Sequence, residues 1–239
     1  MNKVVFETKT ALASYAADLV QHQMERKPDS VLGFATGSTP LGLYGELVKR
    51  NLDFSRVTVF NLDEYYPIKK EDPQSYAYFM KKNLFDKINI RQERCFIPNG
   101  EARDAETECM RYEQLLKAYG GVDLQILGLG ENGHIGFNEP ADELIPLTHK
   151  TDLSASTIRA NARFFSSQDE VPKAALTMGM KTIISAKKII VLVTGVKKSG
   201  ILKRLFEEGI RTKNPASFLW LHPHVTVLVD LEAEQGETL

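Results

Sequence analysis

The stretch Ile189-Ile190-Val191-Leu192-Val193 is apolar at every position, and the turn Thr194-Gly195-Val196-Lys197-Lys198 follows it directly. A half-exposed strand alternates apolar and polar residues, whereas a strand buried on both faces is apolar throughout. Strands of the second kind occur in parallel sheets that helices cover on both sides. This stretch therefore predicts an α/β fold.

Short apolar runs alternate with helical stretches along the rest of the chain. The remaining strands are predicted at Lys3–Phe6, Ser30–Thr36, Val57–Leu62, Arg94–Ile97, Leu124–Leu129 and Val225–Val229, beside Lys188–Thr194. Helices are predicted at Thr10–Met24, from Pro40 to Lys49, and at Tyr76–Phe85, Asp104–Tyr119, Val171–Ile184 and Lys198–Glu208. Strands separated by helices pair in parallel through right-handed crossovers. We expect residues 1–239 to form a single domain with one doubly wound, mostly parallel, Rossmann-like sheet and helices on both faces.

Composition excludes several classes of protein. With 239 residues, 43% hydrophobic and 26% charged, the chain is neither disordered nor collagen-like. Lys+Arg is 30 and Asp+Glu is 31, so the basic excess of most nucleic-acid binders is missing, and we expect no nucleic-acid partner. There is no run of 18 apolar residues, so we expect no membrane span.

The N-terminal residues and the cysteines indicate the compartment. Met1–Phe6 turns polar at Glu7 and lacks the long apolar stretch of a signal peptide, which favours a cytoplasmic location. Cys95 and Cys109 are the two cysteines, and neither stands at the spacing of a zinc site. We expect both to be reduced thiols and expect no metal site.

Ligands of open parallel sheets bind beyond the carboxyl ends of the strands, and four such strand ends carry polar residues. The first is Thr36-Gly37-Ser38-Thr39-Pro40, where Ser38 or Thr39 could cap a helix that has Pro40 at its first position. Free N–H groups at a helix start bind anions, although an ordinary strand-to-helix turn fits equally well. In the turn that follows the strand Lys188–Thr194, Lys198 could meet an anion or lie in solvent.

Two adjacent carboxylates, Asp63 and Glu64, follow the strand Val57–Leu62. A carboxylate here could move a proton on a bound substrate. The alternative is a capping Asp beside a solvated Glu.

The segment Gly128–Pro140, GLGENGHIGFNEP, begins with a match to the dinucleotide fingerprint GxGxxG. That fingerprint requires a helix directly after it, and Gly136 and Pro140 interrupt any such helix. We therefore predict a glycine-rich active-site loop that displays Asn132, His134 and Glu139. Histidine exchanges protons near neutrality, and a carboxylate can orient it.

The 37 residues from Gly130 to Ser166 are too long for an ordinary connection, which favours a functional role. Arg159 and Arg163 lie in this stretch and could supply a second cation, because the guanidinium fork suits phosphate; both could equally be surface ion-pair partners. Together these features indicate proton transfer on a small phosphorylated molecule, with no required metal or redox cofactor.

The same residues carry a resemblance to a known family. The chain resembles glucosamine-6-phosphate deaminases, also called isomerases, over essentially its whole length. The segments that carry the resemblance are LGFATGSTPLGLY, VTVFNLDEYYPI, SYAYFM, LGLGENGHIGFNEP, LTHKT, ANARFF, VPKAALTMG, VLVTGVKKSG and LHPH. The related 6-phosphogluconolactonases share the Gly-His loop but continue it without FNEP. The family converts glucosamine 6-phosphate and water to fructose 6-phosphate and ammonia in amino-sugar catabolism, without a cofactor.

The resemblance implies roles for individual residues. Asp63 would move a proton between C2 and C1, His134 would open the sugar ring, and Glu139 would orient His134. Other members carry Asp or Asn at the position of Asn132, and Asn can position a group here but cannot take up a proton.

The resemblance also implies a phosphate site. The phosphate would lie on the segment formed by Thr36, Gly37, Ser38 and Thr39, with Arg163 and Lys198 as cations. Residues 153–171 would form a lid that carries Arg163.

The resemblance leaves regulation and assembly less defined. Regulated relatives have a longer, basic segment between FNEP and the TH motif, where this chain has the short Ala141–Leu147. We therefore expect little activation by N-acetylglucosamine 6-phosphate. Monomer and homo-oligomer both stay open.

Two other functions stay open. One is a sugar-lactone hydrolase of the 6-phosphogluconolactonase type, and the other is a non-catalytic sugar-phosphate sensor. Release of ammonia from glucosamine 6-phosphate discriminates between the deaminase and both alternatives.

Overall fold

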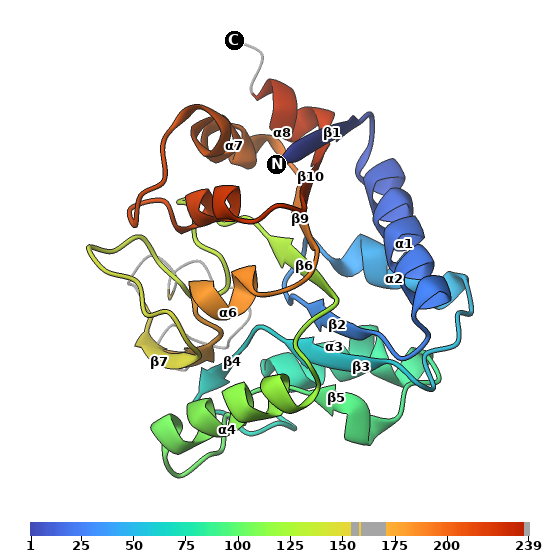
Figure 1. Ribbon diagram of the computed structural model, residues 1–239, viewed down its shortest axis with the longest axis vertical. Coiled ribbons are helices and arrows are strands. Elements are labelled where there is room, and N and C mark those ends of the chain that lie inside the picture. The colour runs from blue at the N-terminus through green and yellow to red at the C-terminus, as the bar shows by residue number, and fades with distance from the viewer. Residues whose placement is uncertain (154–157, 159–170, 237–239) are drawn as a thin grey trace.

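Seven parallel strands form the main sheet of the computed structural model, which describes residues 1–153, 158 and 171–236 (Figure 1). The strand order is β1-β10-β9-β6-β2-β3-β5. The bounds in that order are Asn2–Phe6, Val225–Asp230, Ile189–Val193, Leu124–Gly128, Val31–Phe34, Thr58–Asn61 and Cys95–Phe96. Every pairing in this sheet is parallel. The predicted mostly parallel α/β sheet is thus confirmed.

Strand β9 lies inside the sheet, between β10 and β6, and is buried on both faces. Ile190 and Leu192 pack into one hydrophobic cluster, whereas Val191 and Val193 pack into another on the opposite face. Each face of an α/β sheet needs its own apolar side chains, so the uninterrupted apolar run Ile189–Val193 fits this position.

Helices cover both faces of the main sheet (Figure 1). Their bounds are Lys9–Arg26 (α1), Leu41–Lys49 (α2), Tyr76–Asn83 (α3), Ala105–Ala118 (α4), Met180–Ile184 (α6), Ser199–Glu207 (α7) and Leu231–Gln235 (α8). Short 3-10 helices span Phe85–Lys87, Gln92–Arg94, Val196–Lys198 and Pro215–Leu221. Helices α1, α2 and α3 contribute to one cluster, and α4, α6, α7 and α8 to the other. The hydroxyl of Thr8 and the carboxylate of Asp104 cap α1 and α4.

A second, antiparallel sheet lies beside the main one and was not predicted (Figure 1). Its order is β4-β8-β7, with bounds Asp63–Tyr66, Ala174–Thr177 and His149–Asp152. The prediction of one sheet for the whole chain is therefore wrong. In β7 and β4 the residues are mostly polar or aromatic, so neither segment has the apolar run by which the other strands were found.

The predicted helix Val171–Ile184 is also wrong over most of its length. Ala174–Thr177 is the central strand of the small sheet and is fully buried between its neighbours, and α6 begins only at Met180. Alanine and leucine favour helix, but strand pairing on both sides overrides that preference.

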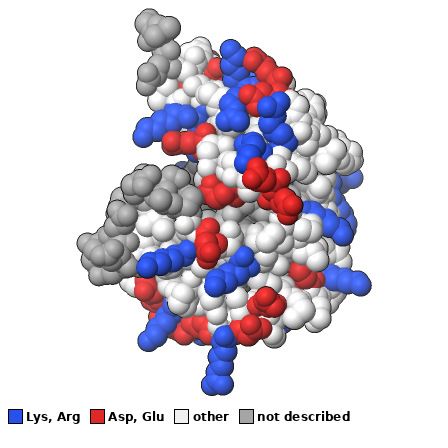
Figure 2. All heavy atoms as spheres, turned by 90° about the vertical axis from the view of Figure 1, so that its left-hand side faces the viewer, with Lys and Arg blue, Asp and Glu red and all other residues white. Residues whose placement is uncertain are grey.

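In the part of the chain that the structure describes, no helix is long and apolar enough to cross a membrane. On the face that Figure 2 shows, acidic and basic side chains are interspersed. The predicted lid at 153–171 falls almost entirely outside the described residues, as do Arg159 and Arg163.

Candidate active site

The carboxyl ends of β2, β3, β6 and β9 open into one cavity of about 380 Å³. All four strand ends that the sequence singled out contribute to it. Its lining comprises Ala35, Thr36, Gly37, Ser38, Thr39, Leu41, Leu62, Asp63, Tyr65, Pro73, Gln74, Ser75, Tyr76, Phe79, Gly128, Leu129, Gly130, His134, Gly136, Phe137 and Lys198. Among the predicted site residues that are described, Asn132 and Glu139 alone lie outside this lining.

The turn after β2, residues 36–39, lines this cavity. Helix α2 begins at Leu41 after Pro40, and no side chain caps it, so the expectation that Ser38 or Thr39 would cap this helix is wrong. The N–H groups of Gly37, Ser38 and Thr39 donate no hydrogen bond to any residue in the described ranges. The hydroxyl of Tyr44 donates to the carbonyl of Ala35 and fixes the start of the turn. Uncapped N–H groups at the start of a helix form an anion site.

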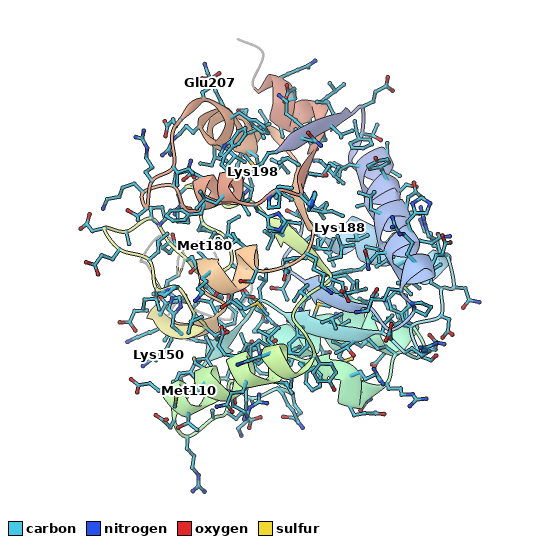
Figure 3. All side chains as sticks on the ribbon, in the orientation of Figure 1. Met110, Lys150, Met180, Lys188, Lys198 and Glu207 are labelled. Carbon is cyan, nitrogen blue, oxygen red and sulfur yellow. The ribbon has the colours of Figure 1, made fainter. Side chains whose placement is uncertain are left out.

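Lys198 adds a positive charge to the lining of the same cavity. It precedes α7 and is half-buried, and Figure 3 shows it among the side chains between β9 and α7. Burial lowers the pKa of Lys198, and the carboxylate of Glu131 opposes that effect. A desolvated ammonium gains more from a bound anion than one in water. Lys198 and the turn at Gly37–Thr39 can therefore bind a phosphate together.

Asp63 lies in the cavity wall at the start of β4, with 6% of its surface exposed. Burial raises the pKa of Asp63 to about 8, and the neighbouring charge of Glu64 adds to the rise. A carboxylate with a pKa near the working pH is an effective general base. Asp63 can thus accept a proton from a substrate held in this cavity.

Glu64 has a different task from its neighbour. Its Oε1 accepts the N–H groups of Tyr65 and Tyr76, both at 2.9 Å, and its Oε2 accepts that of Ala77 at 2.8 Å. Glu64 is thus a buried carboxylate that caps α3 and ties it to β4. The alternative of a capping Asp63 beside a solvated Glu64 is wrong, because Glu64 is the residue that caps the helix and both carboxylates are buried.

The imidazole of His134 lies over Gly130 in the loop after β6. A Cβ at Gly130 would come within 2.4 Å of the imidazole, so this position has no room for any side chain. The loop turns back on itself, because Gly130 N–H donates to His134 O at 3.0 Å and a bridge joins Ile135 to Asn138. No helix follows the GxGxxG match within residues 128–153, as Gly136 and Pro140 predicted, so the segment lacks the helix that the dinucleotide fingerprint requires.

Gly136 brings the loop against Asp63. Its φ is +60°, and a Cβ there would lie 2.9 Å from Thr177 Oγ1 and 3.3 Å from Asp63 Oδ2. Thr177 Oγ1 also accepts the N–H of Phe137 at 3.1 Å. Strand β8 therefore fastens the loop beside the carboxylate.

Asn132 and Glu139, which lie outside the lining, form a connected group with His134, which lies in it. The amide Nδ2 of Asn132 donates to Glu139 Oε2 at 2.6 Å, and Asn132 Oδ1 accepts the backbone N–H of His134 at 3.1 Å. Glu139 Oε1 lies 3.6 Å from His134 Nδ1, which is buried and makes no hydrogen bond within the described ranges. The amide positions the backbone of His134, and the carboxylate lies within ion-pair distance of its ring.

Sequence reasoning missed the aromatic wall of the cavity. The rings of Tyr65 and Tyr76 are 4.8 Å apart, and that of Phe137 stacks on Tyr76 at 6.0 Å with an interplanar angle of 5°. A signal was present, since Tyr65 directly follows the paired carboxylates and Phe137 lies within the glycine-rich loop. Such rings give the cavity a water-excluding side.

Asn214 is a second residue that the sequence did not reveal. It is fully buried against Gly133 of the loop, where a Cβ would lie 2.4 Å from Asn214 Oδ1. Its side-chain nitrogen and oxygen make no hydrogen bond to the described residues.

Arg163, the predicted second phosphate cation, lies outside the described residues. Within the described ranges, no group of three His, Cys, Asp or Glu side chains is arranged to hold a metal ion.

Comparison with known proteins identifies the family. The family described as glucosamine-6-phosphate isomerases/6-phosphogluconolactonase matches residues 6–228. A protein of Halothermothrix orenii named glucosamine-6-phosphate deaminase is 50% identical over 237 residues, with 98% of each chain covered. A protein of the same name from Thermoanaerobacter pseudethanolicus is 47% identical over 237 residues, with 98% of this chain and 94% of that protein covered.

Solved structures agree with this assignment. A structure of a monomeric glucosamine-6-phosphate deaminase matches with a TM-score of 0.96 and 45% identity, over 99% of this chain and 100% of that one. A 6-phosphogluconolactonase from Thermotoga maritima matches with a TM-score of 0.76 and 21% identity, over 96% and 98%, and this likeness concerns the fold alone. With the family matched from residue 6 to residue 228, the chain belongs to the glucosamine-6-phosphate isomerase/6-phosphogluconolactonase family.

Proposed function

We propose that this protein is a glucosamine-6-phosphate deaminase, which converts glucosamine 6-phosphate and water to fructose 6-phosphate and ammonia. The proposal rests on one cavity that is lined by the buried carboxylate of Asp63, the imidazole of His134 and the turn Gly37–Thr39, whose backbone N–H groups donate to no other described residue and can bind a phosphate. Relatives about half identical over nearly the whole chain carry the name of this enzyme, which supports the same substrate.

The phosphate comes first in the proposed reaction, because it places the sugar. The N–H groups of Gly37, Ser38 and Thr39 donate to the phosphate oxygens, and Lys198 supplies the opposing charge, with Thr36 at the edge of the site. Binding energy from this remote group holds the reacting carbons in register with the acid and base.

His134 then opens the pyranose ring. Its imidazole moves a proton from the C1 hydroxyl to the ring oxygen, which yields the open-chain aldehyde. Glu139 lies beside Nδ1 of His134 and stabilises the imidazole when both of its nitrogens carry a proton. Asn132 holds Glu139 in place.

Asp63 acts on the open chain. It takes the proton from C2, the electron pair left there forms the C1=C2 double bond, and O1 takes up a proton to give the enol. The carboxyl then returns its proton to C1 while the C1=C2 electron pair moves to make that C–H bond, the amino nitrogen forms the C2=N bond, and the nitrogen gives up one proton. The product is a ketose imine at C2, which water hydrolyses to the ketone and ammonia. The raised pKa of Asp63 suits both halves of this transfer.

Coupled assays test the proposal. Purified protein should release ammonia and fructose 6-phosphate in equal amounts from glucosamine 6-phosphate, with no added metal. Hydrolysis of 6-phosphogluconolactone without ammonia release would instead identify a lactonase. Binding of glucosamine 6-phosphate without turnover would identify a sensor.

Compartment and assembly form part of the same proposal. Cys95 and Cys109 are both free thiols, which supports the reducing cytoplasm as the working compartment. The related deaminase structure is described as monomeric, which supports a monomer here. Light scattering behind a sizing column gives the assembly directly, and a mass of two or more chains would exclude a monomer.

A further inference from the structure

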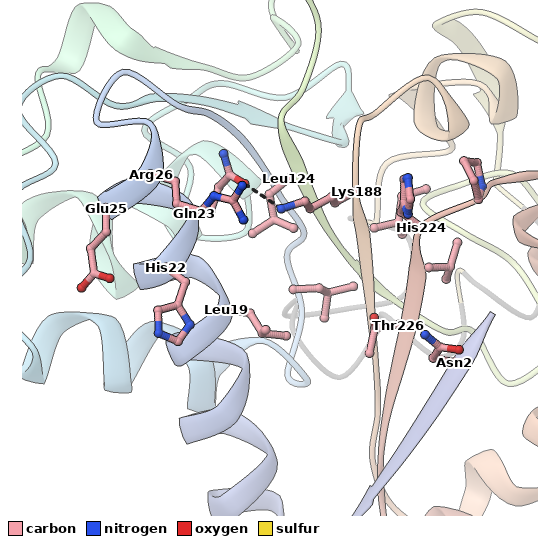
Figure 4. Close-up of a pocket in the computed structure, with 14 residues that line it drawn as sticks. Asn2, Leu19, His22, Gln23, Glu25, Arg26, Leu124, Lys188, His224 and Thr226 are labelled. Carbon is pink, nitrogen blue, oxygen red and sulfur yellow. Dashed lines mark hydrogen bonds between the residues drawn. The ribbon is translucent and has the colours of Figure 1, made fainter.

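A second cavity, of about 570 Å³, lies at the opposite end of the main sheet (Figure 4). It is bounded by the end of α1 and by the amino ends of β6, β9, β10 and β1, through Leu124, Ile189, Val225 and Asn2. The proposed deaminase reaction uses none of the residues that line it.

Basic side chains converge on this cavity from three elements. His22 and Arg26 are one helical turn apart on α1, Lys188 precedes β9 and His224 precedes β10. Figure 4 shows the side chains of Arg26 and Lys188 extending into the same region, where Lys188 Nζ donates to Gln23 Oε1 at 3.5 Å. His22, Arg26, Lys188 and His224 are all exposed, so a ligand in solution can reach them.

The acidic residue Asp123 pairs with other lysines and leaves the charges of Arg26 and Lys188 without a carboxylate partner among the described residues. Lys27 and Lys187 are adjacent in sequence to Arg26 and Lys188, and both form ion pairs with Asp123, at 2.6 and 2.7 Å. Arg26 and Lys188 form no ion pair with any carboxylate in the described ranges.

The cavity lining contains a single carboxylate, that of Glu25, among the described residues. Glu25 Oε1 accepts from Gln21 Nε2 at 2.8 Å, and Figure 4 shows its side chain directed away from Lys188. The charge that faces the cavity is therefore positive.

The remaining lining residues suit the rest of a small molecule. Leu19, Ile190 and Val225 contribute apolar side chains to the lining, and Asn2, Gln23 and Thr226 contribute polar ones. The volume lies within the range of sites for small ligands. An arginine fork and a lysine ammonium are the side chains that most often bind phosphate.

We propose that this cavity binds a small phosphorylated molecule, with Arg26 and Lys188 on the phosphate oxygens and His22 and His224 as further N–H donors. The site is separate from the deaminase cavity, because Leu124 and Ile189 begin the same strands, β6 and β9, whose carboxyl ends open into that other cavity. The proposal does not depend on the deaminase activity.

Titration with inorganic pyrophosphate, followed by the imidazole NMR signals, tests this site. The chain has five histidines, each assigned with a His→Gln variant. We expect His22 and His224 to shift and saturate with a Kd below about 1 mM. The His134 signal reports separately on pyrophosphate in the deaminase cavity, so the two sites are distinguished in one experiment.

The variant Arg26→Gln/Lys188→Gln should raise the Kd measured at His22 and His224 about tenfold or more, and should leave ammonia release unchanged. The control Lys82→Gln/Arg91→Gln removes the same charge from two exposed side chains outside the cavity, and should change that Kd less than twofold. Lys188→Gln alone serves if loss of Arg26 at the end of α1 prevents folding. The proposal is overturned if His22 and His224 do not shift below about 10 mM pyrophosphate, or if both double variants weaken binding equally.

Discussion

The amide Nδ2 of Asn132 donates to Oε2 of Glu139 at 2.6 Å, so an uncharged side chain holds the carboxylate that lies beside His134. The other end of the same amide accepts the backbone N–H of His134 at 3.1 Å. In the proposed mechanism, Asn132 therefore holds both His134 and Glu139 in place and takes up no proton itself.

Replacing Asn132 by leucine removes both of these hydrogen bonds at similar volume. We expect kcat for ammonia release to fall about tenfold or more while KM changes little, because the phosphate site is untouched. Asn132→Asp should recover part of the loss, since a carboxylate still accepts the N–H of His134. Equal kcat values for Asn132→Leu and the unaltered protein would exclude a positioning role.

Asp63→Asn should stabilise the protein while it removes activity. The folded pKa of Asp63, about 8, lies above its ordinary value of 3.8, so the folded state holds a proton that the unfolded state releases between these two pH values. Stability therefore falls as pH rises from 3.8 to about 8, and an asparagine does not pay this penalty. At pH 8 we expect the variant to be at least about 1 kcal/mol more stable, a rise in Tm of about 2–4 °C.

Thermal melting across this pH range measures the effect. The difference in Tm between Asp63→Asn and the unaltered protein should grow with pH. A difference that is constant with pH, or that has the opposite sign, would show that Asp63 is charged at little cost in the folded protein.

The same pKa sets the acid side of the pH profile. The base must be deprotonated to accept the C2 proton, so kcat/KM should fall about tenfold per pH unit below pH 8. The measurement is kcat/KM between about pH 6 and about pH 9. A flat profile below pH 8 would mean that the base in the free enzyme has an ordinary carboxyl pKa.

Gly136→Ala tests the close approach of the loop to Asp63. An added Cβ would lie 2.9 Å from Thr177 Oγ1 at a φ of +60°, so the loop must shift and activity should fall at least about tenfold. Gly45→Ala is the matched control, because a Cβ there has nothing within 4 Å and the position is inside α2. It should leave activity unchanged and raise stability by about 0.5–1 kcal/mol. Similar activities for the two variants would show that the loop tolerates a side chain.

Lys198→Met tests the phosphate site. Removing this half-buried cation should raise KM for glucosamine 6-phosphate about tenfold or more, because a charge-assisted contact to the phosphate is lost. Lys197→Met, one residue away and outside the cavity lining, is the control and should leave KM within about twofold. Equal effects of the two variants would place the phosphate elsewhere.

Much of the fold and of the site could be predicted because the signals are local. Ile189–Val193 and Leu124–Gly128 are apolar strands in the sequence and in the structure, and the rule for parallel sheets brings the residues after them to one cavity. Asp63 and His134 were therefore found from the ends of two predicted strands.

The remaining features depend on contacts that spacing in the sequence does not show. Glu64 caps α3 through Tyr76, 12 positions later, and nothing in the segment Asn61–Tyr66 marks it as the cap rather than Asp63. Ala174–Thr177 looks helical because it is rich in alanine and leucine, and only its pairing with β4 and β7 makes it a strand. Thr177, whose hydroxyl accepts the N–H of Phe137 in the loop after β6, was missed for the same reason.

Exchange of the C2 proton of glucosamine 6-phosphate with solvent deuterium tests the central claim, that Asp63 is the base for this proton. Mass spectrometry of recovered sugar, together with ammonia release, follows the step in Asp63→Asn and in Asp29→Asn, an exposed aspartate outside the cavity lining. We predict that Asp63→Asn loses both exchange and ammonia release by at least about a hundredfold, while Asp29→Asn retains both. Exchange at the unaltered rate in Asp63→Asn would contradict this account and assign the base to another residue.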